Sequence, residues 1–229
     1  MGDSGDSPAD LVPIFPLDVV LVPGAALPLH IFEPRYRALI TDVCGSGAAR
    51  SFGVISVRPG PELGRSVRDS LAEVGTIAEV IEVDPYPDGR SDVLTIGSRR
   101  FRVLEVDSES KPYLRARVEW LEENDGDISP EHVRAARVLC ERYTRMLAQM
   151  SGREAPDDDL SSDPLRLSYQ IAARLRLSSA ERQSLLEAET AAARLYASIA
   201  ALRRESVLIS RTRTVPATPS ALRVSSTSN

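Results

Sequence analysis

Closely spaced prolines constrain the first part of this chain more than any other feature. Between Phe15 and Tyr36, prolines stand at positions 16, 23, 28 and 34. Because each proline fixes φ and removes a backbone donor, this stretch cannot form a continuous helix or a central strand. We expect short extended pieces and bends, followed by a helix that begins at Pro34, since proline suits the first helical position.

The next part of the chain has the signals of a β-rich domain. Apolar residues recur at helical spacing over residues 35–44, and strand patterns follow over residues 51–57 and 73–121. Asp88-Gly89 predicts a hairpin turn, and Gly97-Ser98 predicts a two-residue loop. The last strand alternates cleanly between apolar and charged residues, which places Trp120 in the core.

The apolar period changes from two to helical after residue 128. Ser129-Pro130 and Asp163-Pro164 predict two helix starts, and Ser178 with Glu181 predicts a capping box for a third helix that continues past residue 199. The expected organisation is therefore a disordered N-terminus over residues 1–10, a β-rich domain over 11–123, a helical subdomain over 128–209 and a disordered tail over 210–229.

Composition narrows the class of protein. The net charge of -5 disfavours attraction to nucleic-acid phosphates. Neither cysteine nor histidine clusters, since Cys44, Cys140, His30 and His132 are widely separated, so we expect no metal site, no disulfide and no cofactor. The first ten residues contain three aspartates and no basic residue, which does not fit a secretory signal. We expect a cytoplasmic protein without a membrane span.

Four motifs occur in one order along the chain. The first comprises Pro16-Leu17, Pro28-Leu29 and the run from Ile31 to Tyr36, and the second is the run from Glu73 to Glu79. The third spans residues 97–103, and the fourth spans residues 112–116. Together they resemble the N-terminal substrate-binding domain of Lon proteases, over about residues 11–204. This resemblance implies an α+β fold: a strongly bent, β-barrel-like (PUA-like) domain with one helix, followed by an all-helical subdomain.

The resemblance implies a stand-alone, non-catalytic protein that binds polypeptide. The ATPase and serine-lysine protease modules of Lon need more chain than 229 residues, and the single lysine, Lys111, lies outside any phosphate-binding loop. Ser110 is adjacent to Lys111, but neighbouring side chains of an extended segment point to opposite faces. The implied partners are unfolded or tagged polypeptides, with a protease complex as a further candidate.

An extended peptide needs exposed apolar surface together with a sheet edge or a groove. The candidate peptide-binding residues are Pro28, Leu29, His30, Ile31, Phe32, Arg99, Arg100 and Phe101. The motif residues expected to maintain the fold are Pro16, Leu17, Glu33, Arg35, Tyr36, Gly75 and Gly97. Two alternatives stay open: an adaptor that binds a folded partner through the helical half, and a PUA-like RNA-binding module.

Overall fold

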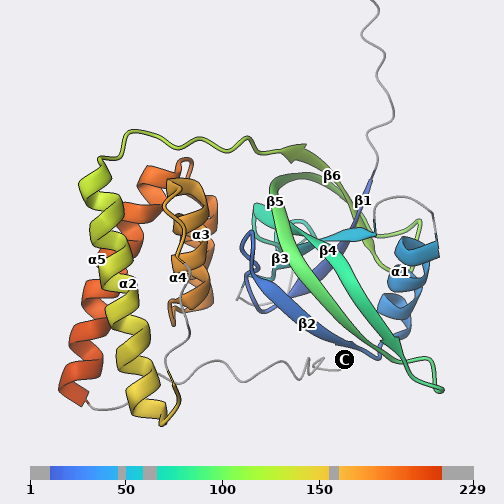
Figure 1. Ribbon diagram of the computed structural model, residues 1–229. Helices are drawn as coiled ribbons and strands as arrows, with labels where there is room; N and C mark the ends of the chain where they lie inside the picture. The colour runs from blue at the N-terminus through green and yellow to red at the C-terminus, as the bar shows by residue number, and fades with distance from the viewer. Residues whose placement is uncertain (1–10, 46–49, 59–65, 155–159, 213–229) are drawn as a thin grey trace, which may run out of the picture. The chain divides into compact units, whose positions relative to one another are not determined.

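The computed structural model describes residues 11–45, 50–58, 66–154 and 160–212 (Figure 1). The expected N-terminal segment and most of the expected tail lie outside these residues, as does the centre of the acidic loop near Asp157. The chain divides into two compact units, Met1–Glu122 and Glu123–Asn229.

The first unit is built on one sheet of six strands. Its elements are β1 (Val12–Leu17), β2 (Ala26–Ile31), α1 (Pro34–Gly45), β3 (Ser51–Ser56), β4 (Val74–Pro85), β5 (Ser91–Asp107) and β6 (Leu114–Trp120). The strand order is β2-β5-β4-β3-β1-β6, and an additional pairing between β5 and β6 closes a ring that leaves β2 attached at the outside of β5. The sheet is ring-like without being a regular barrel, and the predicted α+β class is confirmed.

The proline-rich start differs from the expectation in one respect. The helix begins at Pro34 as predicted, but β1 is not an edge strand, because it pairs with both β3 and β6. The two pairings are staggered: β6 pairs with residues 12–14 and β3 with residues 14–17. Pro13 and Pro16 therefore each have a partner strand on one side only, so a missing donor is tolerated.

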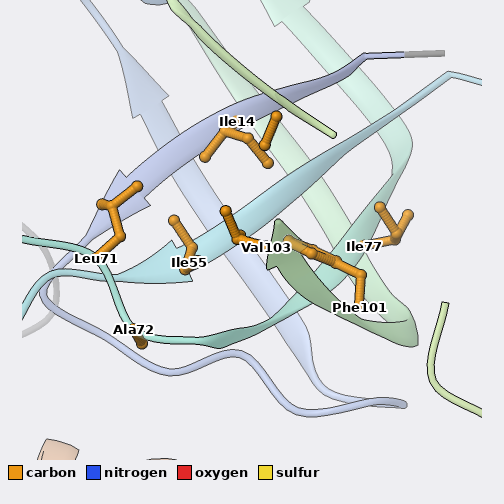
Figure 2. Close-up of a cluster of buried hydrophobic side chains, with 8 residues drawn as sticks. Ile14, Ile55, Leu71, Ala72, Ile77, Phe101 and Val103 are labelled. Atoms are coloured by element: carbon orange, nitrogen blue, oxygen red, sulfur yellow. The ribbon is translucent and has the colours of Figure 1, made fainter. Parts of the chain in front are cut away.

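The β-rich core is organised around the ring of Phe101 (Figure 2). Phe101 is completely buried, and a Cβ added to Gly53 or Gly75 would lie 2.8 Å or 2.5 Å from its Cζ. The Phe101 ring therefore fits against β3 and β4 because Gly53 and Gly75, the two residues beneath it, lack side chains. The other buried members of the cluster are Ile14, Ile55, Leu71, Ala72, Ile77, Val103 and Ala116.

The expected loop at Gly97-Ser98 is wrong, because β5 runs without interruption from Ser91 to Asp107. Gly97 lies inside the strand, where a Cβ would be 2.5 Å from the carbonyl oxygen of Val22. The Gly97 amide donates to Ala25, and the Gly97 carbonyl accepts from the Gly24 amide. This glycine thus permits a close backbone approach within a strand.

The predicted hairpin turn at Asp88-Gly89 is correct: Gly89, with φ 81°, lies in the hairpin between β4 and β5.

The placement of Trp120 in the core is also wrong. Its exposed fraction is 43%, and the Arg99 guanidinium lies 4.0 Å from the ring centroid. Trp120 is the last residue of β6, four residues after Ala116, which belongs to the buried cluster. The alternation predicted which side chains share a face of β6. It did not predict that the core no longer covers this face at the end of the strand.

The second unit contains α2 (Pro130–Ser151), α3 (Pro164–Arg174), α4 (Ser179–Glu187) and α5 (Ala191–Thr212). Ser129 and Asp163 cap α2 and α3, and Ser178 with Glu181 forms the predicted capping box of α4. The expected third helix is two helices, because the chain leaves helical geometry at Ala188 and the Thr190 hydroxyl accepts from the Ala193 amide to begin α5.

A buried arginine stabilises this break between α4 and α5. The Arg194 side chain is fully buried, and its guanidinium donates to the carbonyls of Leu185 and Ala188 at 2.9 and 3.1 Å. It also donates to the Ser168 hydroxyl at 2.9 Å and lies 4.0 Å from the ring centroid of Tyr169. One side chain thereby donates to two carbonyls at the end of α4, where the donors within the helix run out.

Candidate functional site

Apolar side chains are exposed where β2 pairs with β5. Along β2, Leu27, Leu29 and Ile31 are buried while the intervening residues face outward. In register, these intervening residues lie opposite alternate residues of β5, so they share one face of the sheet. We call this surface the β2–β5 outer face; its residues are Ala26, Pro28, His30, Asp92, Leu94 and Ile96.

The outer face exposes two large apolar side chains. Leu94 and Ile96 have exposed fractions of 36% and 39%. They lie opposite Pro28 and Ala26, respectively, so the four residues form one continuous apolar strip. On the β4 side, the register places Glu82 beside Leu94 and Glu79 beside Ile96. The strip is therefore bordered by exposed carboxylates on one side.

Hydrogen bonds order the polar end of the outer face. Asp92 accepts from the Tyr86 hydroxyl at 2.6 Å and from Nδ1 of His30 at 2.6 Å. The Tyr86 hydrogen bond is the main reason that the pKa of Asp92 lies below its usual value, and the His30 bond acts in the same direction. The His30 ring also stacks near Phe32, with 6.1 Å between centroids. Aromatic surface thus continues the apolar strip toward α1.

The structure separates the candidate peptide-binding residues into three groups. Pro28, His30 and Phe32 are exposed, and the first two belong to the outer face. Arg99 is exposed elsewhere, over Trp120. The four remaining candidates are buried: Leu29, Ile31, Arg100 and Phe101.

Sequence reasoning missed Leu94 and Ile96. The run from Val93 to Ile96 is apolar on both faces of the strand apart from Thr95, whereas a strand with one wet face shows polar residues at alternate positions. That missing alternation was the available signal. Thr95 is buried instead, and its hydroxyl donates to the Leu27 carbonyl at 2.9 Å.

The remaining motif residues of the first segment hold α1 against the sheet. Tyr36 stacks on Phe15 with 3.9 Å between ring centroids, and burial raises the pKa of Tyr36. The Arg35 guanidinium lies over the Tyr36 ring and pairs with Glu33 at 2.8 Å. Leu17 is buried, and Pro16 pairs with Ile55 in β3. These contacts fix where α1 begins.

Ser110 and Lys111 have separate partners. The Lys111 ammonium donates to Asp42 at 3.0 Å, whereas the Ser110 hydroxyl donates to Asp107. Hydrogen bonds from Tyr113 and then Lys111 lower the pKa of Asp42. Within the described ranges, no three His, Cys, Asp or Glu side chains are grouped as a metal site would require. None of the helices in the described part of the chain has the length and apolar composition of a membrane-spanning helix.

Solved structures identify the fold as that of Lon N-terminal domains. The Lon N-terminal domain protein from Xanthomonas campestris superimposes with a TM-score of 0.63 at 30% identity, covering 83% of this chain and 97% of that one. The N-terminal domain of a Mycobacterium avium complex Lon protease shares the fold, with a TM-score of 0.57 at 22% identity, and covers 84% of this chain and 98% of that one.

The sequence comparisons identify the family. Residues 11–204 match the ATP-dependent protease La (LON) substrate-binding domain, and this chain belongs to that family. The Lon protease of Parabacteroides distasonis is 30% identical over 209 residues, which are 87% of this chain and 24% of the relative. Lon protease 2 of Syntrophobacter fumaroxidans is 31% identical over 76% of this chain and 22% of the relative. The chain thus spans roughly a quarter of the length of these curated relatives.

Proposed function

We propose that this chain binds unfolded or tagged polypeptides through the β2–β5 outer face and performs no chemistry of its own. The family is that of a substrate-binding domain, which supports a role in substrate recognition. The observation that carries the placement is the exposed strip formed by Leu94, Ile96 and Pro28. An apolar stretch of a client would bury its side chains against this strip.

The face of the sheet suits a peptide better than the edge of β2 does. Among the described strands, β2 pairs only with β5, so its other edge is a candidate for strand addition. Pro28, in the middle of β2, has no backbone N–H to donate to an added strand. We therefore assign the affinity to apolar burial on the outer face.

Peptide binding should depend on the outer face specifically. We expect a labelled apolar peptide to bind with a dissociation constant of about 1 µM or weaker, since ordering the peptide offsets much of the apolar burial. Leu94→Glu or Ile96→Glu should weaken binding by about tenfold or more, because each introduces a charge where a buried apolar contact is needed. Fluorescence anisotropy at two salt concentrations measures the dissociation constant of the natural chain and of each variant.

Leu104→Glu is the matched control for these variants. Leu104 is an exposed leucine on the same strand, β5, and does not belong to the outer face. Peptide affinity should be unchanged in this variant and nearly independent of moderate salt in all variants. Equal weakening by Leu104→Glu, or binding of RNA that weakens steeply with salt, would contradict the assignment.

The purified chain should neither hydrolyse ATP nor cleave unfolded casein. Its single lysine is engaged in the exposed ion pair with Asp42. A phosphate-release assay and gel analysis of casein test this expectation. Turnover that co-purifies with the chain and disappears in Lys111→Ala would overturn it.

The adaptor alternative is supported by exposed side chains on the helical unit. A pocket of ≈ 360 Å³ lies between α2 and α5, with Leu139 and Val207 in its lining. Val207 and the nearby Leu208 are exposed apolar residues. If Val207→Glu abolishes capture of one folded partner while the outer-face variants do not, the adaptor role is the correct one.

A further inference from the structure

A cleft of ≈ 780 Å³ lies in the first unit between α1 and the β4–β5 hairpin. This volume is within the range of about 300–1,000 Å³ that is typical of ligand sites. One face of α1 forms one wall, with residues spaced three or four apart, and the hairpin forms the other. The lining residues that matter below are Arg37, Ala38, Thr41, Cys44, Arg50 and Arg90.

Two of the three arginines in the cleft are available to an anion. Arg90 pairs with Asp88 at 2.7 Å. In the part of the chain that the structure describes, Arg37 and Arg50 form no ion pair with a carboxylate. The Arg37 guanidinium packs against Gly89, whose positive φ and missing side chain leave room for it. The Arg50 guanidinium donates to the Cys44 sulfur at 3.6 Å. Neither guanidinium thus lies within ion-pair distance of a described carboxylate, but Arg37 is close enough to Asp88 to help lower the pKa of that carboxyl.

The two positions along α1 at which the arginines enter the cleft set the size of the ligand. Cys44, which contacts Arg50, follows Arg37 by seven residues on α1, so the two ends of the cleft are about 10 Å apart along the helix axis. In an extended polyproline-type peptide, residues three apart share one side and are separated by about 9 Å. Two carboxylates spaced in this way match the separation of these two positions along α1.

We propose that the cleft binds an acidic segment of a polypeptide, whose carboxylates pair with Arg37 and Arg50. The walls between the two cations are small or apolar, with Ala38, Val83 and Pro85 among them, and suit the intervening residues of such a peptide. A nucleic acid would place phosphates beyond both ends of the cleft, and the net charge of -5 on the chain would repel them. This site shares no residue with the outer face, so it goes beyond the proposed function and can fail independently of it.

Fluorescence anisotropy of a labelled peptide with two aspartates three residues apart tests the proposal. We expect saturable binding that weakens by about fivefold or more when both aspartates are replaced by asparagine, and by a similar factor in Arg37→Gln and in Arg50→Gln. Arg58→Gln is the matched control, since Arg58 is an exposed arginine of the same unit that pairs with Glu73. Raising the salt from about 50 to about 500 mM should weaken binding.

Alkylation of Cys44 supplies a second readout at the cleft itself. Cys44 is partly exposed, whereas Cys140 is buried in the other unit and serves as the internal reference. At ten times its dissociation constant, the acidic peptide should slow alkylation of Cys44 by about tenfold, by mass action. Equal binding of the aspartate and asparagine peptides overturns the proposal, as does an unprotected Cys44. The proposal is also overturned if an oligonucleotide protects Cys44 from alkylation better than the peptide does.

Discussion

Phe101→Ala is expected to lower the free energy of unfolding of the β-rich unit by about 3–5 kcal/mol, because it removes a fully buried ring and leaves a cavity. Trp120 is the sole tryptophan of the chain and ends β6, so its fluorescence in a urea titration follows this unit. Phe32→Ala is the matched control, since Phe32 is 37% exposed. Its effect should stay below about 1 kcal/mol.

The two glycines beneath the Phe101 ring allow a sharper test of the same packing. The three atoms nearest to a Cβ at Gly53 belong to the side chains of Ile14 and Phe101, whereas a Cβ at Gly75 would also lie 2.6 Å from the Val54 carbonyl oxygen. Gly53→Ala should therefore be less destabilising in a Phe101→Leu background than in the natural chain. Gly75→Ala should remain destabilising in both, because the backbone clash persists. Additive effects at Gly53 would show that the ring and the glycine do not share space.

Arg194→Met is expected to destabilise the helical unit by about 3–5 kcal/mol. The substitution keeps an apolar stem but removes the donors to the carbonyls of Leu185, a buried residue, and of Ala188 at the end of α4. It also leaves the Glu123 carboxylate, 4.0 Å from the guanidinium, without this cation. Urea unfolding followed by helical ellipticity measures the change.

Arg203→Met on the same helix is the control for Arg194. Arg203 is exposed, so its replacement should change stability by less than about 0.5 kcal/mol. Equal effects of the two substitutions would mean that the buried guanidinium gains no more from its partners than it loses by leaving water. In that case, the α4–α5 break would owe its stability to the Thr190 cap and to apolar packing.

Local signals predicted the beginnings of elements well in this chain. Pro34 begins α1, and Ser129, Asp163 and Ser178 cap the helices that follow them. Each of these features depends on backbone donors within one turn, so the neighbouring residues contain the necessary information. The family motifs add the fold class for the same chain, because their order along the sequence is specific.

The candidate site was predictable only in part. Eight residues were expected near the binding surface. Pro28, His30, Phe32 and Arg99 are exposed, whereas Leu29, Ile31, Arg100 and Phe101 are buried. Leu94 and Ile96 join the exposed residues of β2 only because β5 pairs with β2 across more than sixty residues of sequence, as in the pairing of Leu94 with Pro28. Likewise, Arg37 and Arg50 line one cleft with Gly89 only after α1 has packed beside the hairpin.

The sequence by itself determined the starts of the helices, the hairpin at Gly89 and the absence of a continuous helix through the first prolines, since these follow from local backbone chemistry. The class of fold came from the order of the family motifs along the sequence. Tertiary structure alone decided that Gly97 lies inside a strand, that Trp120 is exposed and that Arg194 is buried. The physical reason is common to all three. Whether a side chain has room, cover or hydrogen-bond partners depends on strands and helices that are distant in sequence, and burial is a property of those neighbours rather than of the residue itself.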